Sequence, residues 1–291
     1  AVESIEQTYN GSAASGSKIS VTVSRNGDLL SAVWLSNKRG ADVTAANAWA
    51  TVDNVEVEIG GQVIDKQYGH WMQVWTDLSH GGDKLKLLDD GAKGVAAGAD
   101  AQLSYVPLQF WFCRNPGLAL PLIALQYHEV KLNVTFATLN ANDSVSVWCD
   151  YVFLDTDERR RFAQVSHEYL IEQVQFSNEL SVSGTSTQHE LRFNHPVKEL
   201  VWTVNNGTKD ITVNDALLQL NGHDRFKRRE GKYFTKVQRY QYHSGAEDQT
   251  DSVPHVYSFA LKPEEHQPSG TCNFSRIDNA VLNMAHASTT G

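Results

Sequence analysis

The feature that most constrains the fold of this chain is a sequence pattern that occurs twice, about half a chain length apart. Ile-Glu-Gln at residues 5–7 returns at residues 171–173. Four further likenesses follow in the same order in both halves: 24–37 with 193–206, 55–65 with 216–226, 105–117 with 255–270, and 127–137 with 274–285. Chance likeness among short strands is the alternative, but the shared order favours an internal duplication. The 291 residues can hold two copies, because compact domains average roughly 150 residues.

The repeated segments are typical of β-structure. In VEVEI at 55–59, apolar and acidic residues alternate, which is the period of a strand with one face in water. Gly60-Gly61 follows this strand, and Asn221-Gly222 stands at the matching place in the second copy. Both pairs predict two-residue hairpin turns, because primed turns need positive φ at both central residues.

Other segments complete the secondary-structure prediction. A strand is expected over 108–112 (LQFWF), ending at a turn marked by Pro116-Gly117, and another over 145–153. Short helices are expected after the two hairpins and between the copies. Their ranges are 68–78, 231–241 and 156–164, the last with Thr156 as N-cap.

The predicted fold class is therefore all-β, with two tandem sandwiches and a few short helices. A single open sheet of this many strands would curl or split. The first sandwich is expected over 1–156, a connector over 157–167 and the second sandwich over 168–291. An eight-stranded jelly roll is one standard arrangement, because wrapping two sheets hides most strand edges. The pattern fits other sandwiches equally, and both chain ends are expected to be truncated.

The net charge and the cysteines limit the classes of function that the chain could have. A formal net charge of −9 argues against direct, sequence-specific binding of nucleic acid, which needs a basic face. The basic runs at 158–162 and 225–230 include acidic residues, so they are interpreted as solvated or subunit-contacting surface. Cys113, Cys149 and Cys272 lack a C-x-x-C spacing and are predicted to be free thiols, which favours assembly in a reducing compartment.

Sites for chemistry are scarce in the sequence. It contains no H-E-x-x-H, G-x-S-x-G, P-loop or G-x-G-x-x-G motif, so no enzyme activity, cofactor or metal site is predicted. A group of carboxylates near the boundary could serve glycoside hydrolysis or bind Ca²⁺, but a solvated turn and a helix N-terminus explain it better. These residues are Asp150, Asp155, Asp157 and Glu158. Weak candidate glycosylation sequons begin at Asn10, Asn133, Asn142, Asn206 and Asn273.

Two tryptophans keep a second function class open. Trp71 and Trp75 are four residues apart and would share one face of the helix predicted over 68–78. Lectins stack aromatic rings on sugars, so a two-domain carbohydrate-binding sandwich is the alternative function. Core packing or a subunit contact is the other interpretation of this pair.

Long stretches of the chain resemble the major capsid proteins of nucleocytoplasmic large DNA viruses. The resemblance is strongest to those of phycodnaviruses and of relatives such as iridoviruses and mimiviruses. The stretches are RNGDLL (25–30), EIGGQVIDKQYG (58–69), YVPLQFWFCRNPGLALPLIALQYHEVKLNV (105–134), DYVFLDTDERRRFAQVSHEYLIEQVQF (150–176), LNGHDRF (220–226) and YSFALKPEEHQPSGTCNFSRIDNA (257–280). They run nearly from end to end.

This resemblance implies a double jelly roll and a structural role. Three chains would form a capsomer whose six similar lobes mimic a hexagon, and capsomers would tile the icosahedral capsid of a large double-stranded DNA virus. Minor capsid proteins, a nearby internal membrane and assembly in the host cytoplasm are also implied. The two Ile-Glu-Gln phrases would be equivalent early strands. Relatives carry a further C-terminal strand, so the second jelly roll here is expected to lack one.

Overall fold

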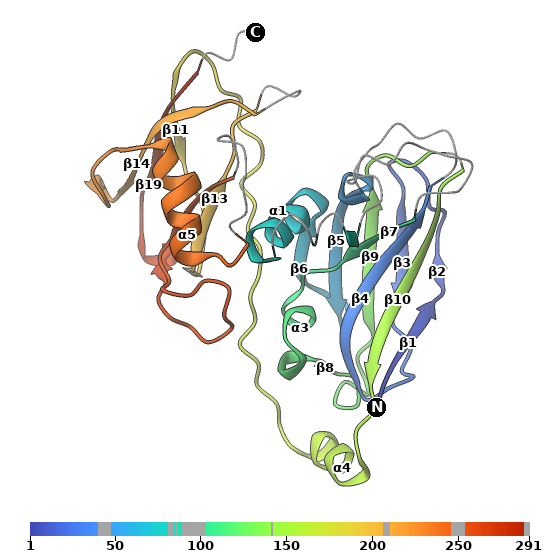
Figure 1. Cartoon of the computed structure of the whole chain (residues 1–291). Coiled ribbons are helices and arrows are strands. Elements are labelled where there is room, and N and C mark those ends of the chain that lie inside the picture. The colour runs from blue at the N-terminus through green and yellow to red at the C-terminus, as the bar shows by residue number, and fades with distance from the viewer. Residues whose placement is uncertain are drawn as a thin grey trace. The chain divides into compact units, whose positions relative to one another are not determined.

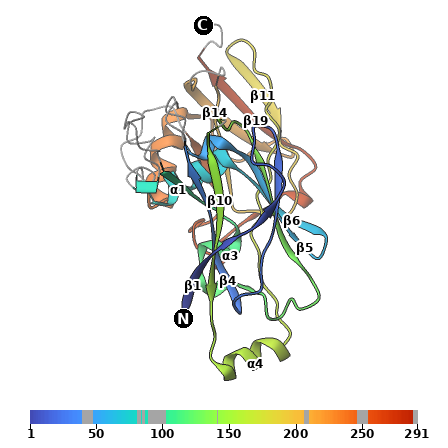
Figure 2. The same ribbon diagram turned by 90° about the vertical axis from the view of Figure 1, so that its right-hand side faces the viewer.

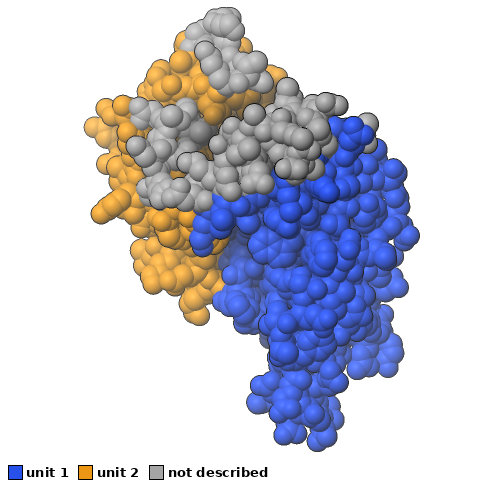
Figure 3. All heavy atoms as spheres, turned by 45° about the vertical axis from the view of Figure 1, so that its right-hand side comes forward, with its two compact units in different colours: residues 1–76, 82–174 blue, residues 77–81, 175–291 orange. Residues whose placement is uncertain are grey.

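The computed structural model of the chain contains two compact units, which Figure 3 colours separately. Unit 1 comprises residues 1–76 and 82–174, and unit 2 comprises residues 77–81 and 175–291. The structure describes residues 1–39, 48–80, 84, 87–88, 103–140, 142–205, 210–245 and 254–287.

Unit 1 is a sandwich of two antiparallel sheets (Figures 1 and 2). One sheet has the order β1-β10-β4-β7, with β8 paired to β4, and the other has the order β2-β3-β9-β5-β6. The strands are β1 (Val2–Gln7), β2 (Tyr9–Asn10), β3 (Lys18–Thr22), β4 (Leu29–Lys38), β5 (Val52–Ile59), β6 (Gln62–Tyr68), β7 (Leu103–Pro107), β8 (Leu120–Pro121), β9 (Val130–Phe136) and β10 (Ser144–Val152).

Alternation explains why these segments pair as they do. Along β10, Val145, Val147, Cys149 and Tyr151 are buried, while the residues between them are more exposed. A one-residue slip would turn this whole set away from the core, so the pattern fixes the register. The buried residues of both sheets form one continuous hydrophobic core in unit 1.

Unit 2 repeats one of these sheets and part of the other. Its larger sheet has the order β11-β19-β14-β15, with β16 also paired to β14. Two small pairs, β13 with β17 and β12 with β18, complete the described sheets. The strands are β11 (Ser186–Glu190), β12 (Pro196–Val197), β13 (Glu199–Trp202), β14 (Val213–Leu220), β15 (His223–Asp224), β16 (Arg229–Glu230), β17 (His255–Ser258), β18 (Cys272–Asn273) and β19 (Ala280–His286).

The helical elements are short. They are η1 (Ala48–Thr51), α1 (Gly69–His80), α3 (Trp111–Arg114), η3 (Pro116–Leu118), α4 (Thr156–Gln164), the π-helical turn η4 (Tyr233–Val237), α5 (Gln238–Tyr242) and η5 (Phe274–Arg276). Helices α1 and η4–α5 follow the hairpins as predicted, and α4 follows β10 within unit 1. The N-cap of α4 is Asp155, whose carboxylate accepts the Thr156 N–H, so the prediction of Thr156 as cap was wrong.

Two strand predictions were also wrong. The segment 108–112 does not form a strand, because Phe110, Trp111 and Phe112 are all buried and the chain coils into α3 to bury successive side chains. The second Ile-Glu-Gln, at 171–173, lies in an extended segment outside any strand. The first, by contrast, pairs with β10. A strand pattern needs a partner strand, and the described residues offer none beside 171–173.

Candidate functional site

The two predicted hairpin turns have matching backbone geometry. Gly60 and Gly61 connect β5 to β6 with φ of 59° and 83°, and Asn221 and Gly222 connect β14 to β15 with φ of 50° and 77°. Left-handed backbone at both centres is the condition that makes glycine and asparagine suitable there. The turns therefore close hairpins at corresponding edges of the two larger sheets.

Each turn is tied to the residue that precedes the central strand of its sheet. The Gly60 N–H donates to the Glu129 carbonyl at 3.0 Å, one residue before β9. The Asn221 N–H donates to the Asn279 carbonyl at 2.6 Å, one residue before β19. In unit 2 the Asn221 Oδ1 also accepts the Asn279 N–H at 3.1 Å. The same anchoring bond occurs in both copies.

The third predicted turn is a short 3₁₀ helix. Pro116 begins η3, and the Asn115 side chain accepts the Gly117 N–H at 2.9 Å. Proline suits a first helical position because its missing N–H would have no partner there. This turn leads into β8, which pairs with the start of β4.

The segment around the second Ile-Glu-Gln belongs to unit 1 and is held there by side-chain contacts. Arg114 Nη1 donates to Glu172 Oε2 at 2.9 Å, and Arg114 Nε donates to the Gln109 carbonyl at 3.0 Å. The guanidinium carbon of Arg114 lies 4.3 Å from the centre of the Trp75 ring. Trp75 also packs against Trp71, with ring centroids 6.0 Å apart. This tryptophan pair therefore packs within the protein, which supports the packing interpretation.

Asp65 receives the next residues of that segment. Its Oδ1 accepts the Val174 N–H at 3.1 Å, and the Gln173 side chain donates to the Ile64 carbonyl. Burial raises the pKa of Asp65 to about 6, although the hydrogen bonds from Val174, Gln67 and Lys66 oppose that shift. Polar contacts to β6, an edge strand, thus replace strand pairing for residues 173 and 174.

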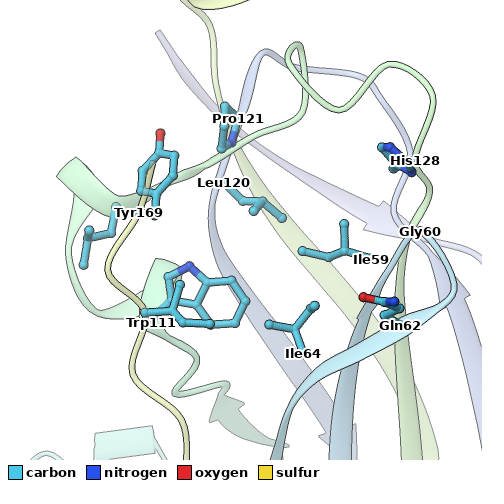
Figure 4. A pocket seen from close by; sticks show the side chains of 11 residues that line it. Ile59, Gly60, Gln62, Ile64, Trp111, Leu120, Pro121, His128 and Tyr169 are labelled. Carbon is cyan, nitrogen blue, oxygen red and sulfur yellow. The ribbon is translucent and has the colours of Figure 1, made fainter. Parts of the chain in front are cut away.

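An apolar cavity of about 520 Å³ lies beside this segment in unit 1. Figure 4 shows Tyr169 and Trp111 on one side and Ile59, Ile64 and the Gly60 turn on the other. His128 and Gln62 contribute polar side chains, and the remaining lining residues are Leu118, Leu120, Pro121 and Ile171. No convergent set of acids, bases or nucleophiles lines the cavity, so it offers no catalytic arrangement.

The five sequons differ in their access to solvent. Asn10 and Asn142 are exposed. Asn133 is buried, and its amide donates to Glu58 at 3.2 Å. The Asn273 side chain accepts the Ser275 N–H at 3.1 Å. Asn206 lies outside the described residues.

The remaining sequence candidates carry structural roles. Asp150 accepts the Trp34 indole N–H at 3.1 Å. Within the described residues no group of three or more histidine, cysteine, aspartate or glutamate side chains could hold a metal ion, and no helix has the length and apolarity to cross a membrane. Cys113, Cys149 and Cys272 are free thiols, as predicted, and burial raises the pKa of Cys113 and Cys149 to about 12.

Two glycines that the sequence analysis missed mark the duplication more sharply than the turns. A Cβ on Gly69 would lie 2.1 Å from the Val52 carbonyl oxygen, and a Cβ on Gly231 would lie 1.9 Å from the Val213 carbonyl oxygen. Val52 and Val213 are the first residues of β5 and β14. In both copies a glycine lets the helix after the hairpin begin against the first residue of the hairpin's first strand, β5 or β14. The signal was available, because each glycine follows its hairpin turn at a similar spacing.

His243 in unit 2 was also missed. Its Nε2 lies 3.0 Å from Glu199 and its Nδ1 lies 3.0 Å from Glu264. Burial lowers the pKa of His243, but the two carboxylates outweigh it and raise the pKa to about 9. The imidazolium therefore joins α5, β13 and the 261–268 segment at neutral pH. Its partners lie far apart in sequence, so no local pattern could reveal it.

Comparison with known proteins accounts for this geometry. The model for the major capsid protein N-terminus matches residues 1–155, and the model for large eukaryotic DNA virus major capsid proteins matches 158–212 and 209–290. The major capsid protein of Pyramimonas orientalis virus is 48% identical, over 97% of this chain and 82% of that protein. That of Paramecium bursaria Chlorella virus 1 is 43% identical, over 98% of this chain and 79% of that protein.

The solved structures agree with the sequence matches. The chain superimposes on the subunit in a quasi-atomic model of the Paramecium bursaria Chlorella virus 1 capsid with a TM-score of 0.84 and 38% identity, covering 99% of this chain and 84% of that one. The Faustovirus major capsid protein shares the fold, with a TM-score of 0.68 at 12% identity.

Two β-sandwiches in tandem, each with a glycine-dependent hairpin and a following helix, define the double jelly-roll class of viral capsid proteins. The chain belongs to the family of large eukaryotic DNA virus major capsid proteins. The predicted fold class and structural role are confirmed, and the carbohydrate-binding alternative has no support among these comparisons.

Proposed function

We propose that three copies of this chain form a capsomer and that capsomers tile an icosahedral shell. The repeat of one sheet plan in the two units carries this proposal: β5, β6 and β9 in unit 1 have counterparts in β14, β15 and β19 in unit 2. Three chains would then present six similar lobes, so a threefold particle could occupy a hexagonal lattice. A closed threefold ring is the expected product of a heterologous interface.

Each chain would contribute two jelly rolls to the capsomer, and further proteins would join the capsomers. The jelly rolls are proposed to span 1–156 and 168–291, with 157–167 as connector. Gly60-Gly61, Asn221-Gly222 and Pro116-Gly117 are proposed as the turns that shape the lobe ends. Minor capsid proteins would join the capsomers close to an internal membrane, and assembly would take place in the host cytoplasm.

Mass measurement of the full chain in solution tests the trimer. The expected result is a stable species of three times the 32.4 kDa chain mass that needs no added sugar or metal. Class averages from electron microscopy should show threefold symmetry with a hexagonal outline. Obligate assemblies bury about 2,000–5,000 Å² per interface, so the trimer should survive dilution to nanomolar concentrations. A monomer that binds glycans would overturn the proposal.

A further inference from the structure

Arg39, directly after the end of β4 in unit 1, is a buried positive charge with no hydrogen-bond partner among the described residues. The Arg39 side chain is 1% exposed, and its Nε, Nη1 and Nη2 atoms make no hydrogen bond in the part of the chain that the structure describes. Two residues earlier, Asn37 is 3% exposed, and both its Nδ2 and its Oδ1 lack partners there. Buried guanidinium groups are normally paired with an anion, because desolvation of an unpaired charge is very costly.

Both residues stand at the end of β4: Asn37 is its last residue but one, and Arg39 directly follows its last residue. Residues two apart in a strand point the same way, and Val33 and Leu35, which precede Asn37 in this series, belong to the core of unit 1. In the sheet Asn37 is opposite Ser104 of β7 and Val145 of β10. The inward face of β4 is thus apolar until it nears the end of the sandwich, where an amide and a guanidinium follow one another.

We propose that Arg39 and Asn37 form a binding site for one oxyanion group, either a free phosphate-like ion or the carboxylate of an acidic side chain from a second copy of this chain. A guanidinium offers two parallel N–H donors to such a group, and the Asn37 Nδ2 can add a third. The chain has a net charge of −9, so overall charge would not attract a stray anion. Binding would depend on this local pair.

The first experiment follows thermal unfolding of the full chain in chloride buffer and in inorganic phosphate at matched ionic strength. Wild type should be stabilised by phosphate, with about a tenfold gain in the folding equilibrium constant at ten times the dissociation constant. Arg39→Met, which keeps an unbranched apolar stem and removes the charge, should lose this response. In chloride it should melt no lower than wild type, because an unpaired buried charge has been removed. Lys38→Met, which removes an exposed charge next door, should respond like wild type.

The second experiment distinguishes the sources of the oxyanion. Sedimentation of wild type, Arg39→Met and Lys38→Met is compared over a range of chain concentrations without phosphate. Weaker self-association of Arg39→Met alone, with no phosphate response in wild type, would assign the carboxylate of a second copy. A phosphate response with unchanged association would assign the free ion. If Arg39→Met does not fold, Asn37→Leu, which keeps the guanidinium, is used in its place and should weaken whichever response wild type shows.

The proposal is overturned if Arg39→Met and Lys38→Met behave alike in both experiments. It is also overturned if Arg39→Met is less stable than wild type in chloride while phosphate and association show no difference. That outcome would mean that an acid of the same chain already neutralises the guanidinium. If none of the three proteins forms a trimer, the proposed capsomer is contradicted. The phosphate experiment still tests the Arg39 site, because it measures thermal unfolding and does not depend on the trimer.

Discussion

Unit 1 and unit 2 share a plan but differ in how completely it is built. In unit 1, β4 has a partner on each side, β10 and β7, whereas among the described residues its counterpart β13 in unit 2 pairs only with β17. The two Ile-Glu-Gln phrases, which both lie in unit 1, differ too: the first forms a ladder with β10, and the second is held by side-chain contacts to Arg114 and Ile64. The same three residues therefore form a strand only where a neighbouring strand satisfies their backbone.

The hydrophobic core is also larger and more continuous in unit 1 than in unit 2. Among the described residues, the core of unit 1 is a single cluster of 28 buried residues, while unit 2 has separate clusters of 7 and 4. Burial of apolar area is the main favourable contribution to folding. Unit 2 should therefore tolerate damage less well, and the β13 edge, which has no partner among the described residues, should be the first part of the chain to lose order.

The glycines before the two helices test this comparison most severely. Gly69→Ala and Gly231→Ala each place a methyl group within about 2 Å of a strand carbonyl, so each should lower the free energy of unfolding by about 3 kcal/mol or more. We expect Gly231→Ala to abolish a folded unit 2, since its core is smaller. Gly69→Ala should leave a folded but weakened unit 1.

Limited proteolysis with mass spectrometry identifies which unit has opened in each variant. Gly117→Ala is the control, because the nearest atom to its added methyl would be a side-chain oxygen at 3.3 Å. If both units of the Gly231→Ala variant resist proteolysis as well as those of wild type, the shared role of these glycines is contradicted.

Hydrogen exchange tests the open edge directly. The amides of β13 should exchange about 100-fold faster than those in the middle of β4, because local opening of a strand with one partner costs less free energy. Residues 171–174 should also exchange quickly, apart from the Val174 amide that donates to Asp65. Equal protection in β4 and β13 would show that another segment covers the free edge.

His243 offers a pH-dependent comparison, because unit 1 has no described counterpart of this buried imidazolium with two carboxylates. The pKa of His243 is raised to about 9 in the folded chain, so its stabilisation is complete below the ordinary pKa near 6.5 and is lost as the pH rises through 9. Wild type should exceed His243→Gln in stability by about 2 kcal/mol at pH 6, and the difference should vanish by pH 10.

Chemical denaturation at several pH values measures this difference. His223→Gln, which changes an exposed histidine on β15, is the control and should leave the profile of wild type unchanged. A wild-type advantage that persists above pH 10 would mean that His243 stabilises unit 2 by packing instead of charge.

Sequence reasoning succeeded where a local pattern decides the structure. Alternation located β5 and β10, and the Gly60-Gly61 and Asn221-Gly222 pairs located two hairpins, because strand periodicity and positive φ are properties of adjacent residues. It failed where a distant partner decides. The predicted strand over 108–112 is absent, because the chain enters α3 at Trp111 with Phe110, Trp111 and Phe112 all buried. Residues 171–173 contact side chains and carbonyls within unit 1 in place of a partner strand.

The candidate sites divide in the same way. The three turns could be read from glycine, asparagine and proline, but the contacts of Asp65, Arg114 and His243 join residues that are 21 to 109 positions apart. Unpartnered groups such as Arg39 are visible only once burial is known. Knowledge of the family supplied the fold and role, whereas these contacts had to come from the structure.

The hairpin turns give the smallest expected effect and the closest match between the two units. An added methyl at Gly61 or Gly222 would meet nothing within 4 Å, so only the left-handed backbone resists substitution. Gly61→Ala and Gly222→Ala should each cost about 1 kcal/mol, by nearly equal amounts, while Gly222→Val should cost more because β-branching adds strain at positive φ. Chemical denaturation of the single variants measures these costs. If Gly222→Val melts like wild type, the turn in unit 2 does not need its left-handed backbone, and the two hairpins are not equivalent after all.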